Sequence, residues 1–419
     1  MTPVSFRAEP FRLFFPLAFV LGAAGVAHWL LFTTGAIGSY LGRFHAVTQT
    51  QAFLVTFAAG FLLTAIPTRT RTRPPSWIEM GALLVLLPVV SLATLFDAPL
   101  LGQAAYAAAL LVIAQFAIWR FVGRAAERRP PASFALVPIG LAAGLAGAAL
   151  TSAGLAEAGP VWMLGLGRRL VFEGVFTCLT LGIGAFFLPL AGRGEAAPDL
   201  DKGKKLAVVA YAAAGLLILG GLVVEVAFSP RGGAVLRAAV AIAVLTASGA
   251  FRTPSRPGAN RWLVWLAAWA IPIGLLGAAL FPDHRVEALH VMFVGGFGLL
   301  AFAVSTHVIL GHTGHEATQA GRPWPVLAFG ALFAAAMGLR ASATAVPEHY
   351  FWWLGAAAAL WLAGATVWAI FVLPKLWRAP LAPASGGRTA PPGSSDPISR
   401  APRGPASPRP SGRPPGTSG

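Results

Sequence analysis

Twelve long apolar runs follow one another along the chain, and short polar connections separate them. Most runs are long enough to cross a bilayer, because about 20 apolar helical residues span its roughly 30 Å hydrocarbon core. Only 11% of the residues are charged, against about 25% in a typical soluble protein. We therefore predict an all-α integral membrane protein with about twelve transmembrane helices. The predicted helices cover residues 11–32, 46–66, 77–96, 100–119, 134–154, 161–190, 206–228, 234–251, 262–281, 286–310, 326–343 and 351–372.

The Lys and Arg residues test this topology, since short cytoplasmic loops are enriched in them. With the N-terminus inside, seventeen of them fall in the N-terminal segment and the even-numbered loops, and five fall in the odd-numbered loops. Both termini are therefore expected to be cytoplasmic. The five assigned to the outer loops are Arg43, Arg231, Arg237, Arg285 and Arg340.

The net charge of +16 would by itself suggest a nucleic-acid partner. The positions of the basic residues favour the lipid bilayer instead, because Lys and Arg in short loops set topology and contact anionic headgroups. We expect no nucleic-acid partner, and the sequence identifies no protein partner.

The composition changes near the C-terminus. Residues 1–378 form the predicted transmembrane domain, whereas residues 379–419 are rich in Pro, Ser, Gly, Ala and Arg. Such a segment has too little apolar surface to offset the entropy lost on ordering, so we predict a disordered cytoplasmic tail. Only a short echo links residues 57–63 with residues 293–299, and no internal repeat is expected.

Ionisable residues inside the predicted helices are candidates for function, because a polar or charged side chain in lipid is costly unless it finds a partner. The predicted topology places one group of them in the outer part of the membrane, where they can meet in a polar chamber. Arg168 and Arg169 suit haem propionates or an ion pair with Glu173, although adjacent helical residues cannot both face the same way. The whole group is His28, His45, Arg168, Arg169, Glu173, Glu225 and His290.

Three histidines belong to the tenth predicted helix and its end: His290, His307 and His312. His290 and His307 lie roughly 25 Å apart along a helix, so they cannot bind one metal ion. Neutral imidazole binds copper, zinc and haem iron. The intramembrane histidines, however, lack a tight i, i+4 spacing, and no Cys-containing haem attachment sequence occurs. Metal ligation and structural roles therefore both stay open from the residues alone.

Several blocks of sequence resemble the NnrS family of bacterial membrane proteins. The stretch from His290 through the LGHTG of residues 310–314 is similar to the family's His-containing helix with the same ending. Residues 44–46 resemble its WHAHE segment, and residues 60–67, GFLLTAIP, resemble its GFLLTAVP. Residues 167–170 with 186–189 resemble its sixth helix, and residues 10–12 its N-terminal PFR.

This resemblance implies a twelve-helix protein of the bacterial inner membrane. It also implies an association with haem and copper and with responses to nitric oxide, nitrosative stress and denitrification. Carried over residue by residue, it nominates His45, His290 and His312 as haem or metal ligands, with Arg168 and Arg169 as cofactor-binding partners. No specific reaction follows from it.

The chain departs from the family pattern next to His45. Val47 and Thr48 stand where the family has a second His and a Glu, and Phe44 stands where it has Trp. His307 and His315 each stand where an Arg is expected. These replacements make a divergent member with altered or absent metal binding an open alternative.

Two further functions compete with a cofactor-binding protein. One is a transporter of a small molecule or metal that uses Arg168, Glu173 and Glu225 as its substrate site. The other is a membrane scaffold or sensor without a cofactor, which the replacements beside His45 would explain.

Overall fold

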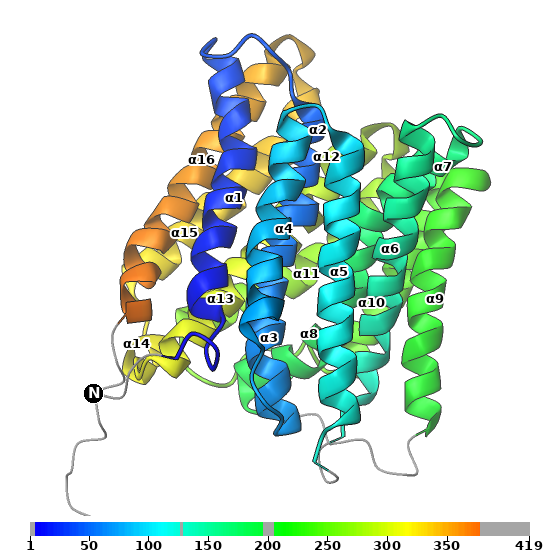
Figure 1. Cartoon of the computed structure of the whole chain (residues 1–419). Coiled ribbons are helices and arrows are strands. Elements are labelled where there is room, and N and C mark those ends of the chain that lie inside the picture. Colours follow the sequence, from blue (N-terminus) through cyan, green and yellow to red (C-terminus); the bar gives the residue numbers. More distant parts are fainter. Residues whose placement is uncertain (1–4, 126–128, 196–204, 378–419) are drawn as a thin grey trace, which may run out of the picture. The chain divides into compact units, whose positions relative to one another are not determined.

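The computed structural model describes residues 5–125, 129–195 and 205–377. Within these ranges all regular elements are helices, and twelve helical segments are long and apolar enough to cross a membrane (Figure 1). This confirms the predicted all-α, twelve-span fold. The predicted tail, residues 379–419, lies outside the described residues.

The chain alternates long α-helices with short helical turns. The α-helices are α1 (Phe11–Thr33), α2 (Gly42–Val47), α3 (Val55–Thr70), α4 (Trp77–Leu95), α5 (Pro99–Val122), α6 (Leu136–Leu155), α7 (Trp162–Arg169), α8 (Val175–Arg193), α9 (Lys205–Ala227), α10 (Pro230–Ala247), α11 (Ala259–Leu280), α12 (Arg285–His290), α13 (Leu299–His312), α14 (Glu316–Ala320), α15 (Trp324–Ala341) and α16 (Tyr350–Val372). The π-helical segments are Thr48–Leu54, Leu170–Gly174 and Val291–Gly298. Short 3₁₀ turns cover Ala132–Ala135, Pro282–His284, Ala343–Ala345, Pro347–His349 and Leu373–Trp377.

The predicted and observed spans differ mainly at their ends. The eighth span begins at Pro230 rather than at residue 234. Ser229 caps it, because its side chain accepts a hydrogen bond from the Gly232 N–H at 3.0 Å, and Pro230 fits the first helical position. A capping signal therefore extends the span beyond its apolar run.

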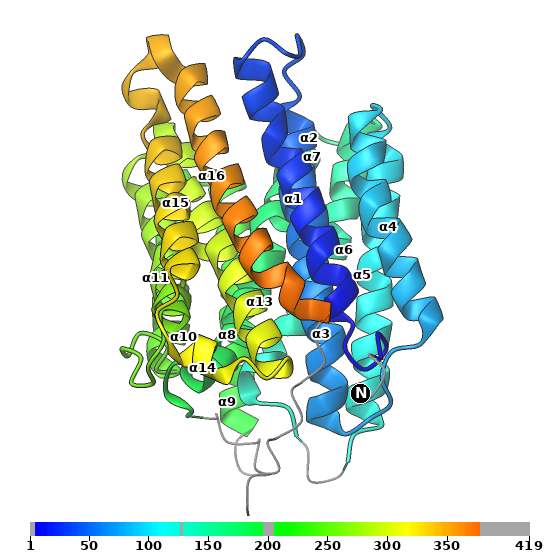
Figure 2. The ribbon, with the colours of Figure 1, turned by 90° about the vertical axis from the view of Figure 1, so that its left-hand side faces the viewer.

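The twelve spans can be divided, in chain order, into three groups of four, and the spans within each group pack in the same way. In each group the third and fourth spans form a pair, and the fourth span packs on the first span of the next group. The pairs are α4 with α5, α9 with α10 and α15 with α16, and the contacts between groups are α5 with α6, α10 with α11 and α16 with α1. The last contact closes a ring, and Figure 2 shows α16 beside α1. The two similar short stretches, residues 57–63 and 293–299, lie in the second span of the first group and the second span of the third group.

The second span of each group lies inside this ring. These central spans are Gly42–Thr70, Trp162–Arg193 and Pro282–His312, and 83%, 78% and 61% of their most apolar stretches are buried. No other span exceeds 56%. Residues that face one another between the central spans are therefore shielded from lipid by the other helices.

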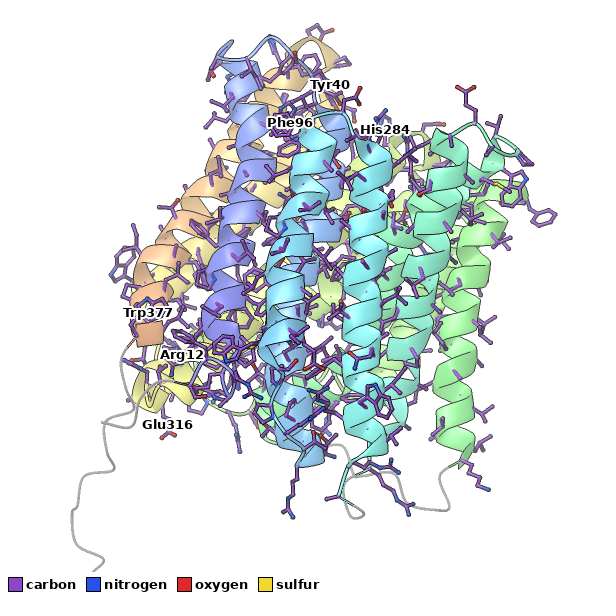
Figure 3. The ribbon with its side chains drawn as sticks, in the orientation of Figure 1. Arg12, Tyr40, Phe96, His284, Glu316 and Trp377 are labelled. Atoms are coloured by element: carbon purple, nitrogen blue, oxygen red, sulfur yellow. The ribbon has the colours of Figure 1, made fainter. Side chains whose placement is uncertain are left out.

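The two ends of the bundle can be named from residues labelled in Figure 3. Tyr40, Phe96 and His284 lie at one end, called here the Tyr40 end, and Arg12, Glu316 and Trp377 lie at the other, the Trp377 end. The first and last spans meet at the Trp377 end, where the rings of Phe6 and Trp377 pack edge to face at 6.1 Å. Because the number of spans is even, the first span starts and the last span finishes at the same end of the bundle.

Each central span changes from a short α-helix into a π-helical segment near the Tyr40 end. The order is α2 then Thr48–Leu54, α7 then Leu170–Gly174, and α12 then Val291–Gly298. Among the described residues the other nine spans contain no π-helical segment. Such segments are rare and occur frequently at functional sites, because the wider turn redirects side chains. The three segments thus indicate a site between the central spans.

Candidate functional site

A cavity of about 330 Å³ lies between the central spans near the Tyr40 end. All three π-helical segments or the short helices before them contribute to its walls. The walls are mostly apolar and include the aromatic rings of Trp29, Phe53, Phe172, Phe293 and Trp361. The polar lining residues include His45, Gln49, Glu173, Arg285, His290 and Arg340. The structure therefore brings the predicted ligands His45 and His290 to one cavity, from different helices.

The ring of His45 is held in one orientation by the backbone of α1. Its Nδ1 donates to the carbonyl oxygen of Gly25 at 2.9 Å, since a carbonyl can only accept. A Cβ atom on Gly25 would come within 2.5 Å of the Gln49 amide and 2.9 Å of the Thr48 methyl group. Glycine at this position thus permits the close approach that the hydrogen bond needs. The neutral ring then keeps its Nε2 lone pair free to bind a metal.

His290 is held in a similar way, within its own helix. Its Nδ1 donates to the carbonyl oxygen of Val286 at 2.6 Å, one helical turn earlier. The ring also packs edge to face on Phe293, with centroids 5.9 Å apart. Metal-binding histidines commonly donate their second ring N–H to a backbone carbonyl or a carboxylate, which fixes the tautomer. Both cavity histidines meet this condition.

The replaced positions beside His45 do not face the cavity. Val47 and Thr48 are buried, with 4% and 0% of their surfaces exposed, and neither lines the cavity. Thr48 instead packs toward Gly25. The two positions at which the chain lacks the family's second His and its Glu therefore contribute no side chain to the cavity wall.

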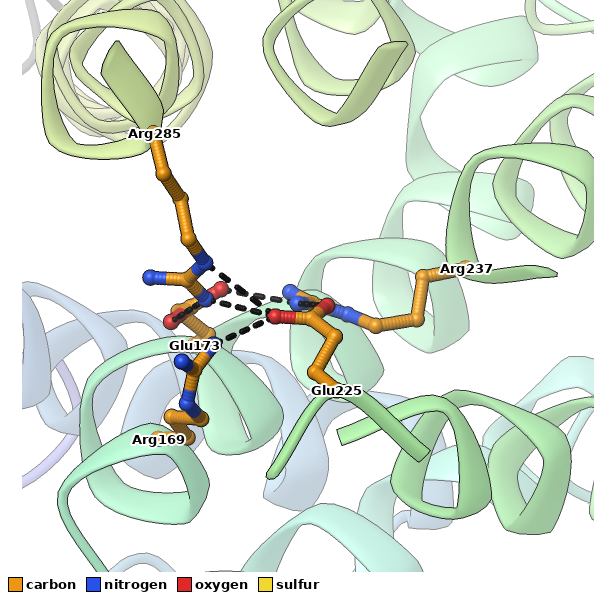
Figure 4. A network of polar contacts seen from close by, with 5 residues as sticks. All are labelled: Arg169, Glu173, Glu225, Arg237 and Arg285. Carbon is orange, nitrogen blue, oxygen red and sulfur yellow. Dashed lines mark hydrogen bonds and ion pairs between the residues drawn. The ribbon is translucent and has the colours of Figure 1, made fainter. Parts of the chain in front are cut away.

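Two glutamates and three arginines form a buried ion-pair network beside the cavity (Figure 4). Arg237 Nη1 lies 2.5 Å from Glu225 Oε1 and 2.8 Å from Glu173 Oε2. Arg285 Nη2 lies 2.6 Å from Glu173 Oε1 and 2.8 Å from Glu225 Oε2. Arg169 Nη1 lies 2.5 Å from Glu225 Oε2. The five residues come from four different spans, so the network joins the helices at the Tyr40 end.

The network connects the cavity wall to the protein interior. Glu173 and Arg285 line the cavity, whereas the side chains of Glu225 and Arg237 are completely buried. Breaking a buried pair by removing one partner leaves an uncompensated charge, at a cost of about 3–5 kcal/mol. The network therefore fixes the start of the helix that carries His290, since Arg285 is only five residues before it.

These contacts involve part of the group of ionisable residues that the sequence placed at one depth. The structure brings together Glu173, Glu225 and Arg169, but Arg168 is exposed and lines no wall of the cavity. His28 also stays outside the cavity, where its Nε2 accepts a hydrogen bond from the Leu41 N–H at 3.1 Å. Cofactor binding by Arg168 and Arg169 stays a prediction: neither residue lines the cavity, and Arg169 is paired with Glu225.

Arg237, Arg285 and Arg340 are site residues that the sequence interpretation missed. It assigned all three to outer loops, where basic residues set topology. Instead Arg237 and Arg285 complete the ion-pair network, and Arg340 lines the cavity 3.5 Å from Glu287. A carboxylate without a positive partner costs free energy in the membrane. Glu173 and Glu225 therefore indicated that nearby arginines turn toward the protein interior.

His312 lies far from the cavity, at the Trp377 end. Its Nδ1 is 3.2 Å from Glu9 Oε1, and its ring packs edge to face on Phe11 at 5.1 Å. Glu9 also accepts a hydrogen bond from Arg12 at 2.7 Å. Burial alone would raise the pKa of Glu9, but the hydrogen bonds from His312 and Arg12 outweigh it and lower that pKa. His312 thus has a structural contact that holds the segment before α1, and its predicted metal role stays untested.

The part of the chain that the structure describes contains no group of three or more His, Cys, Asp and Glu side chains arranged around a metal ion. The cavity offers two imidazoles, and the one carboxylate in its wall, Glu173, is paired with Arg237 and Arg285. Such a donor set matches a cofactor that supplies most of its own ligands, as the porphyrin nitrogens of haem do, or an ion of low coordination number.

Comparison with known proteins agrees with this architecture. A search of curated sequences finds no match. The family model described as NnrS protein matches residues 5–379. This range includes all twelve spans, both cavity histidines and the five residues of the ion-pair network. The chain is a multi-pass membrane protein, and it belongs to the NnrS family.

Proposed function

We propose that this protein binds haem in the cavity between the central spans, with His45 and His290 as iron ligands. The observation that carries the proposal is the placement of the two imidazoles. Both line one cavity, and both use Nδ1 to donate to a backbone carbonyl, which leaves each Nε2 available. Neutral imidazole with a fixed tautomer is the form that binds haem iron.

The walls of the cavity support a planar apolar cofactor. Trp29, Phe53, Phe172, Phe293 and Trp361 provide aromatic surface in a site shielded by the ring of helices. Burial in such surroundings excludes water and tunes the redox potential of a bound iron. Haem, when bound, supplies a one-electron redox centre.

The arginines of the cavity support the same proposal. Haem carries two carboxylates, and a carboxylate in the membrane needs a positive partner. Arg285 and Arg340 line the cavity, and Arg340 has only a 3.5 Å contact with Glu287 in the structure. Arg340, in place of Arg168 and Arg169, is the residue that would meet a propionate, because Arg285 is already paired with Glu173 and Glu225.

A copper ion on the two imidazoles is the second candidate. Imidazole is a good copper ligand, and the cavity volume of about 330 Å³ lies at the lower end of the range for small-molecule sites. A copper ion needs less space than a porphyrin. Because Val47 and Thr48 do not line the cavity, neither candidate depends on the side chains at these two positions.

The physiological part of the proposal follows from the resemblance to NnrS proteins. We place the protein in the inner membrane of a bacterium, with both termini cytoplasmic, as the distribution of Lys and Arg favours. Its role there is in the response to nitric oxide and nitrosative stress, including that linked to denitrification. A redox-active cofactor in an apolar intramembrane site suits a protein exposed to a small membrane-permeant gas.

The test is to purify the protein in detergent after expression with an assured haem supply. Iron and copper are quantified per chain, and a dithionite-reduced minus oxidised absorption spectrum is recorded on the same sample. A haem spectrum with stoichiometric iron supports the proposal, and stoichiometric copper without haem supports the second candidate. A protein with neither refutes both, and favours the scaffold or sensor alternative.

A further inference from the structure

A second, smaller cavity of about 110 Å³ lies between the same three central spans. Each span contributes a phenylalanine to its wall: Phe57, Phe176 and Phe297. These spans run from the Tyr40 end toward the Trp377 end, and most lining residues follow those of the first cavity in sequence. The second cavity therefore lies deeper in the bundle.

The two cavities are neighbours. Leu54, at the end of the first π-helical segment, lines both of them. On another side of the second cavity, Phe61 packs edge to face on Phe187 at 5.6 Å, and Phe187 packs in the same way on His307 at 5.5 Å. An aromatic contact therefore bounds the second cavity, and Leu54 belongs to the walls of both cavities.

The chemistry of the second cavity is almost purely apolar. Thr180 and Ser305 are the only lining residues with polar side chains, and the Ser305 hydroxyl donates to the carbonyl oxygen of Phe302 at 2.9 Å. A buried water needs two to four polar partners, and a cavity without them stays dry. Dry cavities lined by Leu, Ile and Phe bind small apolar molecules such as benzene or xenon.

We propose that this second cavity is a binding site for a small uncharged apolar molecule, of the size of a noble-gas atom or a diatomic gas. Its volume and lack of charge exclude haem, anions and metal ions. Such a molecule dissolves in the bilayer, so it can reach a site within the membrane without an aqueous channel. Held there, it would lie next to the His45 and His290 cavity, with which the site shares Leu54. This inference does not depend on which cofactor the first cavity binds.

Xenon is a suitable probe, because it is apolar, monatomic and visible by anomalous scattering. Crystals of the full chain pressurised with xenon are expected to show a peak between Phe57, Phe176 and Phe297. Ala301→Leu adds three carbons at the wall of the cavity, and should abolish the peak. Ala58→Leu fills the same space from a different helix and serves if the first variant does not fold.

Ala104→Leu is the matched control, since Ala104 is exposed on α5 and does not line the cavity. It should leave the xenon peak unchanged. The proposal is overturned if the wild-type cavity takes up no xenon, if ordered water fills it, or if the peak persists in folded Ala301→Leu or Ala58→Leu protein.

Discussion

Arg237 and Glu225 are joined by a 2.5 Å contact between two side chains that have no exposed surface. Their pair ties α9 to α10, and Glu173 and Arg285 extend it to two of the central spans, Trp162–Arg193 and Pro282–His312. Glu225→Gln would leave the fully buried Arg237 side chain with one fewer negative partner. We expect a loss of about 3–5 kcal/mol in the free energy of unfolding, as for other buried pairs from which one partner is removed.

This loss can be measured by thermal unfolding of the purified protein in detergent. Glu348→Gln is the control, because Glu348 is exposed and belongs to no part of the network. A Glu225→Gln protein as stable as the control would show that the network contributes little to stability.

Gly25 provides a second test, through its contacts with the helix that carries His45. Gly25→Ala would push a methyl group into Gln49 and Thr48 and displace the carbonyl that orients His45. We expect reduced cofactor content and a stability loss of about 1–3 kcal/mol from overpacking. Gly38→Ala is a suitable control, since a Cβ there meets no atom within 4 Å. Equal cofactor content in both variants would contradict the role given to Gly25.

A substitution of Arg340 tests whether its positive charge acts on a cofactor bound in the cavity. If haem binds beside it, its positive charge stabilises the reduced iron, whose net charge is lower. Arg340→Gln should therefore shift the midpoint potential to more negative values in a redox titration followed by absorption. Arg168→Gln should leave the potential nearly unchanged, because Arg168 lines no wall of the cavity. The opposite pattern would restore Arg168 as the cofactor partner.

The contacts of Glu9 with His312 and Arg12 predict that the stability of the fold depends slightly on pH. Because His312 and Arg12 lower the pKa of Glu9 in the folded protein, the contact stabilises the fold fully above the unfolded carboxyl pKa of about 4.3. That stabilisation is lost as the pH falls through the lower, folded pKa. The side chains are partly exposed, so we expect less than about 1 kcal/mol at pH 7.

Unfolding of wild-type and Glu9→Gln protein can be compared from pH 7 down to acid. The difference between them should be largest near neutral pH and should vanish when the wild-type Glu9 is protonated. A difference that grows in acid would mean that the contact acts with the opposite sign.

The sequence predicts the fold well, because each span is a long apolar run and bilayer thickness sets its length. It also predicts that His45 and His290 lie at the same depth, since the alternation of Lys and Arg fixes the direction of each helix. Residues that share a depth need not share a cavity, however. His28 has a comparable predicted depth but faces the backbone of Leu41.

The π-helical segments and the inward arginines could not be predicted in the same way. A π-helical turn such as Val291–Gly298 depends on packing against neighbouring helices, and its residues are as apolar as those of an ordinary span. Arg285 begins α12, and Arg237 lies near the start of the predicted span 234–251, where a basic residue usually contacts headgroups or water. Only their spatial neighbours, Glu173 and Glu225, reveal that they are paired inside the protein.

The measurement that tests the central claim most directly is the haem spectrum of three histidine variants, with iron quantified in each sample. The account predicts about one haem per chain in the wild type, with haem lost or its spectrum shifted in His45→Ala and in His290→Ala. His312→Ala should keep the wild-type spectrum, because His312 lies with Glu9 and Phe11, apart from the cavity. Wild-type haem content and spectrum in folded His45→Ala and His290→Ala proteins would contradict the account.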